Sequence, residues 1–314
     1  MRIYRQAVGS AGALAASHRG AVIAVGNFDG VHMGHQTVIG EAGKLAEAGG
    51  HAWGVLTFEP HPRCIFQPDV APFRLTPFRA KAEAIEALGV DFMIAQRFDV
   101  AFSQQSAQAF IEDYLVKGLG VRHMVAGYDF KFGHKRQGTC ATLLSAGREM
   151  GFDFTVVSAA SDDGGGLYSS SRVRELVQAG QMHATADVLG RPFAISGRVM
   201  GGDKLGRTIG FPTANIALGG YIHPAFGVYA VRVLRADGSR VGGVANLGSR
   251  PTVNGNAPRL EVHLFDFDAD IYGERLNVSL LEMIRPEKKF DGLDALKAQI
   301  ADDCVSARTL LQQK

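Results

Sequence analysis

The chain of 314 residues lacks a charge imbalance, a disulfide framework and a long apolar run. Its 33 basic and 31 acidic side chains leave a net charge of +2, which is too small to favour a nucleic acid or a membrane surface as partner. The cysteines are scattered and form no CxxC pair, which favours a reducing, cytoplasmic compartment: Cys64, Cys140 and Cys304. No apolar run approaches the roughly 20 residues that span a bilayer, so the sequence predicts no membrane-spanning helix.

The N-terminus shares one property with secretory signals, because the basic segment Met1-Arg2-Ile3-Tyr4-Arg5 precedes an Ala- and Gly-rich stretch. That stretch runs to Ser17, is poor in Leu, Ile and Phe, and is followed at once by a strand pattern. We therefore favour a retained N-terminus over a cleaved signal.

What is present is typical of a globular protein, with 46% apolar and 20% charged residues and a length that predicts about two domains. In the first half, near-continuous apolar runs predict strands at residues 21–25, 52–58, 92–95, 123–126 and 154–157. Apolar residues at helical spacing predict helices between them at residues 38–48, 76–88, 106–116 and 142–150. This alternation predicts an α/β fold with a doubly wound parallel sheet, covered by helices on both faces.

The pattern changes at Gly190-Arg191-Pro192, after helical stretches at residues 171–179 and 183–189. Short strand-like runs separated by Gly and Asn follow at residues 193–199, 227–234, 240–247, 259–265 and 276–284, and then a helix at residues 290–311. They predict an antiparallel β-barrel or sandwich with a terminal helix, of which we favour the barrel. We place the two domains at residues 1–185 and 186–314, because the break lies between Gln181 and Arg191.

The most informative segment follows the first predicted strand and reads Gly26-Asn27-Phe28-Asp29-Gly30-Val31-His32-Met33-Gly34-His35. Its glycines allow a tight turn, and helical spacing begins after it. Two histidines therefore stand at a helix start, where backbone N–H groups and the helix dipole favour phosphate. Imidazole donors there can meet charge that develops on a phosphate in a transition state. The chain has neither a Walker A nor a GxGxxG pattern, so a nucleotide site has to be built in this other way.

Two other interpretations of His32 and His35 stay open on the residues alone. The pair could ligate zinc, although spacing identifies no further Cys, His or carboxylate ligand. It could also be a pair of ordinary structural histidines, which the surrounding glycines and Asp29 make less favourable. Two more polar segments follow strands and should share the same sheet edge: Glu59-Pro60-His61-Pro62-Arg63 and Gly127-Tyr128-Asp129-Phe130-Lys131-Phe132-Gly133.

Together these segments resemble the FAD synthetase module of bacterial bifunctional riboflavin kinase/FAD synthetases, which belongs to the HxGH nucleotidylyltransferase superfamily. Ser169-Ser170-Ser171-Arg172-Val173-Arg174 also fits that family, whose usual form is Ser-Ser-Thr-x-Ile-Arg. Ser171 and Val173 replace Thr and Ile and keep the chemical type. Read alone, the serine segment could equally be a helix N-cap followed by a solvated face.

The resemblance implies that the phosphate of FMN attacks the α-phosphorus of ATP and that pyrophosphate leaves. By analogy, His32 and His35 are catalytic and stabilise that transition state. The resemblance assigns further nucleotide contacts to Gly26, Phe28, Asp29 and Gly34.

Other residues of this module receive roles on the two sides of the reaction. Ser170, Ser171 and Arg174 would hold the leaving phosphates, a task that suits hydroxyls and a fixed-charge guanidinium. The flavin side would be formed by His61, Arg63, Asp129 and Phe130. The first two of these could instead be ordinary loop residues, since loops concentrate both kinds.

A glycine-rich segment with two cations opens the second half: Gly197-Arg198-Val199-Met200-Gly201-Gly202-Asp203-Lys204-Leu205-Gly206-Arg207-Thr208-Ile209-Gly210-Phe211-Pro212-Thr213-Ala214-Asn215. Its glycines let backbone approach a ligand, and Lys204 and Arg207 bring positive charge. The alternative is a hairpin loop with two solvated cations. Thr213 and Asn215 add neutral oxygen ligands that suit a hard cation such as Mg²⁺, shared with the phosphates of a substrate.

This segment resembles the riboflavin kinase module of the same family, whose mark is Gly-x-Pro-Thr-Ala-Asn. The similarity continues through residues 227–230, 243–252, 260–267 and 285–290 and the final helix. It implies that Thr213 and Asn215 bind Mg²⁺ with ATP, and that Glu261 takes the proton from the ribityl hydroxyl that attacks the γ-phosphorus. It also assigns nucleotide contacts to Lys204, Gly206 and Arg207 and a flavin contact to Asn246. Without the family, Glu261 would be a solvent-facing strand residue.

The resemblance covers almost the whole chain, so we expect a bifunctional enzyme that phosphorylates riboflavin to FMN and adenylylates FMN to FAD. Its expected partners are the small molecules ATP, riboflavin and FMN, with Mg²⁺ as cofactor; the sequence does not set the oligomeric state. The alternatives are an enzyme with one active module and a non-catalytic flavin- or nucleotide-binding sensor. Retention of His32, His35 and Glu261 argues against the sensor, since binding alone requires none of them.

Overall fold

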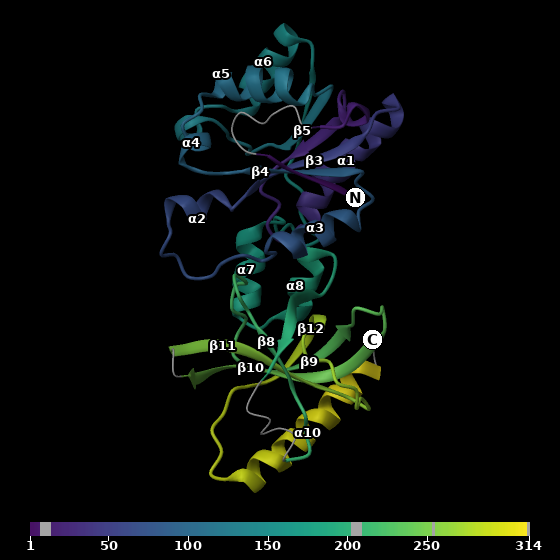
Figure 1. Cartoon of the computed structure of the whole chain (residues 1–314), viewed down its shortest axis with the longest axis vertical. Coiled ribbons are helices and arrows are strands. Elements are labelled where there is room, and N and C mark those ends of the chain that lie inside the picture. Colours follow the sequence, from purple (N-terminus) through teal and green to yellow (C-terminus); the bar gives the residue numbers. More distant parts are fainter. Residues whose placement is uncertain (7–13, 202–208, 253–254, 313–314) are drawn as a thin grey trace. The chain divides into compact units, whose positions relative to one another are not determined.

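The computed structural model describes residues 1–6, 14–201, 209–252 and 255–312 of the chain. These residues form two compact units (Figure 1). The first unit contains Met1–Val70 and Thr76–Ser169, and the second contains Ala71–Leu75 and Ser170–Lys314. The second unit is therefore not contiguous in sequence, because a short segment from the first half belongs to it.

The first unit is built on a six-stranded sheet in which all neighbouring strands are parallel. The order is β1-β4-β3-β2-β5-β6, so the chain reverses its direction of travel across the sheet between β2 and β5. Ligands of open α/β sheets bind at such a switch point, beyond the carboxyl ends of the strands. The strands are β1 (Arg2–Gln6), β2 (Val22–Val25), β3 (Trp53–Glu59), β4 (Phe92–Arg97), β5 (His123–Gly127) and β6 (Asp153–Val157).

Helices cover both faces of this sheet, which confirms the predicted doubly wound architecture. The central strand shows why, since Val22 and Ala24 of β2 belong to one buried cluster and Ile23 and Val25 to another. A strand buried on both faces has no polar alternation, which is why it reads as a continuous apolar run. The helices of this unit are α1 (Met33–Gly49), α2 (Pro62–Phe66), α3 (Phe78–Glu86), α4 (Val100–Ser103), α5 (Ala107–Ala109), a π-helix (Phe110–Leu119) and α6 (Cys140–Met150), with 3-10 turns at Ala16–His18 and His134–Arg136.

No strand is predicted from the sequence at the N-terminus, whereas β1 forms one edge of the sheet. It pairs with β4 from Arg2 opposite Phe92 to Gln6 opposite Gln96. Only Tyr4 and Gln6 of the strand are buried, and the exposed residues Ile3 and Arg5 alternate with them. The strand therefore carries too little apolar sequence to be recognised by hydrophobicity.

The second unit contains a closed barrel of six antiparallel strands in the order β10-β11-β8-β7-β12-β9. This confirms the barrel rather than the sandwich. The short strand β8 was not predicted, because it has four residues of mixed polarity. The elements of this unit are α7 (Ser170–Gln178), α8 (Met182–Leu189), β7 (Phe193–Met200), β8 (Ala214–Ala217), β9 (Gly227–Leu234), β10 (Arg240–Thr252), β11 (Gly255–Leu264), β12 (Arg275–Pro286) and α10 (Leu293–Gln312).

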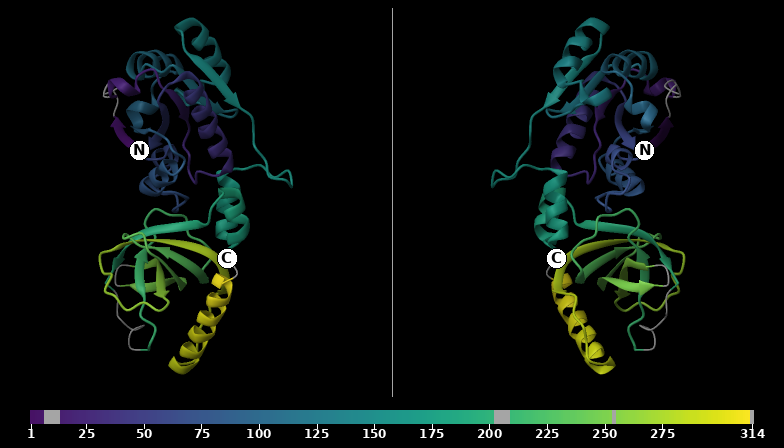
Figure 2. Two further views of the ribbon diagram at one scale, coloured as in Figure 1. Left: turned by 90° about the vertical axis from the view of Figure 1, so that its right-hand side faces the viewer. Right: turned by 90° about the vertical axis from the view of Figure 1, so that its left-hand side faces the viewer.

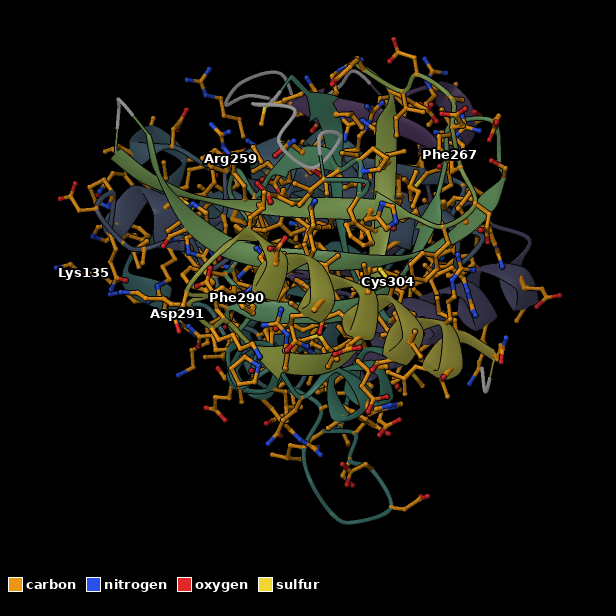
Figure 3. All side chains as sticks on the ribbon, turned by 90° about the horizontal axis from the view of Figure 1, so that it is seen from below. Lys135, Arg259, Phe267, Phe290, Asp291 and Cys304 are labelled. Carbon is orange, nitrogen blue, oxygen red and sulfur yellow. The ribbon has the colours of Figure 1, made fainter. Side chains whose placement is uncertain are left out.

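The terminal helix α10 lies along the outside of the barrel, where Cys304 marks it in Figure 3 and Figure 2 shows it from two sides. Two arginine–aspartate pairs join it to β12 and to the residues that follow β11. Arg285 of β12 donates to Asp303 at 2.7–3.1 Å, and Arg308 donates to Asp266 at 2.8 and 2.9 Å. Buried apolar contact is made by Val228, Ala230, Val244, Phe265 and Ala307. The predicted terminal helix is thus confirmed as part of the barrel domain.

Candidate active sites

The two motif histidines lie at the start of α1, just after the loop that follows β2, as predicted. His32 is the N-cap residue of α1, and its Nδ1 accepts a hydrogen bond from the backbone N–H of His35 at 3.3 Å. A ring nitrogen that accepts carries no proton, so the neutral ring holds its proton on Nε2. The two imidazoles stack with their centroids 3.6 Å apart. The structure therefore places two stacked imidazoles at a helix N-terminus, the position that favours a phosphate.

The turn before the histidines is held in an unusual conformation. Phe28 and Val31 have φ values of 47° and 45°, in the left-handed region that bulky residues rarely adopt. Phe28 is buried, and its ring meets His35 edge-on at 5.3 Å. A Cβ on Gly34 would lie 3.2 Å from the Tyr168 carbonyl oxygen and 3.3 Å from Cε1 of His32. A side chain at position 34 would therefore force its neighbours to shift by a few tenths of an ångström.

Asp29 anchors this turn to the segment that precedes α3. Its Oδ1 accepts from the Thr76 backbone N–H at 3.1 Å, while the Thr76 hydroxyl accepts from the Gly30 N–H at 2.8 Å. Asp29 is 1% exposed. The carboxylate is thus used to hold the loop, and its predicted contact with a nucleotide stays a prediction.

The other two predicted rim segments follow β3 and β5, which flank β2 in the sheet. His61 is the N-cap residue of α2 and accepts from the Arg63 N–H at 3.1 Å, and Arg63 Nε donates to Gln67 at 2.9 Å. After β5, Asp129 is exposed and the Phe130 ring stacks on Phe132 at 5.7 Å. Three adjacent strands therefore bring Gly26, His32, His35, His61 and Asp129 to one edge of the sheet, while their individual ligand contacts stay predictions.

Sequence reasoning missed a buried cation beneath this rim. Lys81 of α3 is 0% exposed, and its Nζ lies 2.7 Å from Glu59 Oε1 and 3.2 Å from the Thr57 hydroxyl oxygen. A signal existed in the sequence, since Lys81 falls on the apolar stripe of its helix with Phe78, Ala82 and Ile85. A lysine on a stripe that packs against a sheet has to find a partner inside the protein.

The predicted phosphate-binding serines and arginine open α7 in the second unit. Ser170 is the first residue of that helix, and Ser171 is exposed. Arg174 Nε donates to the Phe73 carbonyl at 2.9 Å, and the guanidinium lies over the Phe73 ring at 5.5 Å. The segment Ala71–Leu75 thus packs against the helix that carries Arg174.

In the barrel, three predicted site residues form one row across adjacent strands. Asn246 of β10 pairs with Glu261 of β11, and Glu261 pairs with Asn215 of β8. Directly opposed residues of antiparallel strands point to the same face. All three are half-buried, whereas Leu260 and Val262, which flank Glu261 on the strand, are fully buried on the other face. The carboxylate therefore stands between two amides on the face away from the barrel core.

The predicted metal ligand Thr213 lies directly before β8, two residues from Asn215. Its neighbour Pro212 accepts a 2.9 Å hydrogen bond at its carbonyl from Nδ1 of His263. His263 follows Glu261 by two residues and shares its face of β11, and sequence reasoning did not single it out. Three predicted nucleotide contacts lie outside the described residues: Lys204, Gly206 and Arg207.

Two features are absent from the part of the chain that the structure describes. No group of three or more His, Cys, Asp or Glu side chains is placed to hold a metal ion within residues 1–6, 14–201, 209–252 and 255–312. In that same part of the chain no helix is long and apolar enough to cross a membrane. The cytoplasmic location stays a prediction.

A histidine pair at the switch point of a doubly wound sheet, joined in one chain to a barrel with a carboxylate–amide row, defines a two-domain nucleotidyl- and phosphotransferase. Family profiles agree: one described as FAD synthetase matches residues 14–172, and one described as riboflavin kinase matches residues 189–311. The chain belongs to the family of bifunctional riboflavin kinase/FMN adenylyltransferases.

Curated relatives match over nearly the full length of both chains. The bifunctional riboflavin kinase/FMN adenylyltransferase of Escherichia coli K12 is 45% identical over 293 residues, covering 93% of each chain. That of Bacillus subtilis 168 is 40% identical over 287 residues, covering 90% of each. A crystal structure described as a macrolide-efflux protein from Streptococcus pneumoniae has a TM-score of 0.83 and 30% identity, covering 95% of this chain and 97% of that one. The efflux activity in that description is said of the streptococcal protein and is not carried over to this chain.

Proposed function

We propose that this chain phosphorylates riboflavin to FMN in its barrel domain and adenylylates FMN to FAD in its parallel-sheet domain, at two chemically separate sites. The observation that supports separate sites is the distribution of the reactive groups. The stacked pair His32 and His35 belongs to the first unit, whereas the row that contains Glu261 belongs to the second. The domain limits 1–185 and 186–314 belong to the same proposal.

In FMN adenylylation, the phosphate oxygen of FMN attacks the α-phosphorus of ATP, and the bond to the β-phosphate oxygen breaks as pyrophosphate leaves. Charge grows on the non-bridging oxygens of the α-phosphate. A proton held on Nε2 of His32 and the N–H groups at the start of α1 are donors for that charge. Ser170, Ser171 and Arg174 remain the proposed ligands of the leaving phosphates.

In riboflavin phosphorylation, Glu261 takes the proton from the ribityl hydroxyl as that oxygen attacks the γ-phosphorus of ATP. Backbone pairing places Glu261 between Asn246 and Asn215 on the neighbouring strands, and a carboxylate within reach of a hydroxyl can accept its proton. The hydroxyl of Thr213 and the amide oxygen of Asn215 are hard oxygen donors and fit Mg²⁺, which prefers a few protein oxygens together with substrate phosphates and water. When bound, the ion supplies charge neutralisation on the phosphates.

Two single substitutions test the separation of sites. His32→Ala should lower FAD formation from FMN by about 10²- to 10³-fold, the usual loss for a transition-state donor, while riboflavin is still converted to FMN. Glu261→Ala should abolish FMN formation from riboflavin while added FMN is still adenylylated. Chromatographic separation of riboflavin, FMN and FAD after incubation with ATP and Mg²⁺ measures both steps at once.

The untreated wild-type chain is the reference for this test. Accumulation of FMN alone would leave only the kinase, and absence of both products would support a binding protein without turnover. If either substitution abolished both activities in a folded protein, the assignment of one reaction to each proposed domain would be wrong.

A further inference from the structure

The buried ion pair under the rim of the parallel sheet is not used by either proposed reaction. Lys81 of α3 is completely buried, and Glu59 at the end of β3 is 16% exposed. Their charged atoms are 2.7 Å apart. Replacing a buried ion pair by apolar side chains of similar size is often neutral or stabilising, so such a pair is weak evidence for a role in stability. Its place in the fold suggests a different role.

From Lys81 a chain of hydrogen bonds leads to the turn that carries the catalytic histidines. Lys81 Nζ donates to the Thr57 hydroxyl oxygen at 3.2 Å. The same hydroxyl donates to the carbonyl of Asn27 at 3.1 Å. Because a hydroxyl has a single proton, the ammonium group directs that proton toward Asn27 by occupying the oxygen as a donor. Asn27 immediately precedes Phe28, the first residue of the turn with a left-handed backbone.

The same side chain also reaches the second rim segment. Glu59 begins the segment that continues through His61 and Arg63, and its carboxylate is held by Lys81. One ammonium group therefore fixes two strand ends, β2 through Thr57 and Asn27, and β3 through Glu59. Strained turns persist only where the surrounding structure holds them firmly, and the turn of Phe28 and Val31 meets that condition here.

We propose that Lys81 is a positioning residue of adenylyl transfer, which acts through Thr57 and Glu59 to hold the histidine turn against the segment that follows β3. This inference rests on the proposed function of the first unit. Lys81 contacts neither nucleotide nor flavin. Its effect is to keep His32 and His35 where the α-phosphate develops charge, so its loss lowers kcat more than it raises KM for ATP.

The hydroxyl link permits a matched test at a single position. Thr57→Val keeps the shape of the fully buried side chain and removes its hydroxyl, whereas Thr57→Ser keeps the hydroxyl and removes a methyl group. Because a misplacement of about 1 Å can cost on the order of 10²-fold in rate, we expect Thr57→Val to lower kcat for FMN adenylylation by roughly 10- to 100-fold. Thr57→Ser should stay within about threefold of the wild type in kcat, although it leaves the larger cavity.

Two internal references make the result interpretable. Riboflavin kinase activity resides in the other unit and should stay unchanged in both variants. The chain has one tryptophan, Trp53, on the same strand as Thr57, so its fluorescence reports the folding of this sheet. A role in packing alone would make Thr57→Ser the more damaged variant and would leave kcat per folded molecule equal in the two; that result would overturn the proposal.

A second variant keeps the test decisive if Thr57→Val fails to fold. Lys81→Met combined with Glu59→Gln removes both charges, so no uncompensated charge remains buried. The proposal requires this double variant to show the tryptophan emission of a folded sheet and a kcat for adenylylation reduced to the same extent. Normal adenylylation by the folded double variant would refute it. Absence of FAD formation in the wild type would instead refute the proposed function.

Discussion

The tight packing at Gly34 should make the proposed adenylylation site sensitive to a single methyl group. In Gly34→Ala the new Cβ would lie 3.2 Å from Cβ and the carbonyl oxygen of Tyr168 and 3.3 Å from Cε1 of His32, where ordinary contacts are 3.4–4 Å. The Tyr168 contact includes backbone, so the His32 ring is the part that gives way. Relief needs a shift of about 0.2–0.5 Å, and at about 10²-fold in rate per 1 Å this corresponds to a roughly three- to tenfold loss of kcat.

The free energy of unfolding of Gly34→Ala should rise or stay unchanged, although its kcat falls. Alanine is favoured over glycine inside a helix by about 0.8–1 kcal/mol, with less to gain near the helix start where Gly34 lies. Gly40→Ala in the same helix is the matched control, because no described atom beyond its chain neighbours and the nearby backbone of the helix lies within 4 Å of its Cβ position. It should raise the free energy of unfolding by up to about 1 kcal/mol and leave adenylylation unchanged.

The assay is FAD formation from FMN, normalised to riboflavin kinase activity in the same sample, with thermal unfolding measured in parallel. Equal adenylylation rates in Gly34→Ala and Gly40→Ala would refute the reasoning that Gly34 sets the position of His32. A fall in kinase activity to the same extent as adenylylation would point to general unfolding and refute it too.

Two further predictions concern the barrel. His263→Asn keeps an N–H donor near the position of Nδ1 and should retain most riboflavin kinase activity. His263→Ala loses the hydrogen bond to the Pro212 carbonyl and should raise KM for Mg²⁺–ATP several-fold. Equal KM values in the two variants would contradict this prediction. Hydrogen bonds from Arg308 hold the pKa of the Asp266 carboxyl below its usual value, so this pair stabilises the fold above the unfolded pKa near 4 and ceases to do so as pH falls through the folded pKa. Arg308→Gln should therefore lower the unfolding temperature at pH 7 and match the wild type in strong acid; a deficit independent of pH would contradict the assignment.

The fold was largely predictable because its central strands are buried on both faces. Val22 and Ile23 face opposite sides of the sheet and are both apolar, so the strand is an uninterrupted apolar run in the sequence. Apolar residues at helical spacing mark the helices between the strands. Edge and barrel strands were harder. β1 has few buried residues, and β8 has only four residues, so neither has an apolar pattern long enough to be distinguished from a loop.

The site could be predicted as a set of segments rather than as a network of contacts. Topology placed His32, His61 and Asp129 at one edge, since each follows one of three adjacent strands. The sequence could not show that the Asp29 carboxylate accepts a hydrogen bond from the Thr76 N–H. That bond joins residues 47 apart and depends on the unusual backbone conformation of the turn. Lys81 was missed for a similar reason, as its partners lie on another element.

The segment Ala71–Leu75 has a consequence for how this chain can be divided or recombined. The second unit draws its residues from two places in the sequence, and Arg174 rests on Phe73 within it. A gene fragment that encodes residues 186–314 would therefore deliver the barrel without α7 and without the segment that supports it. Exchange of the second unit between two relatives would have to transfer residues 71–75 together with residues 170–314. The boundary between the two units therefore cannot be made with a single cut in the sequence.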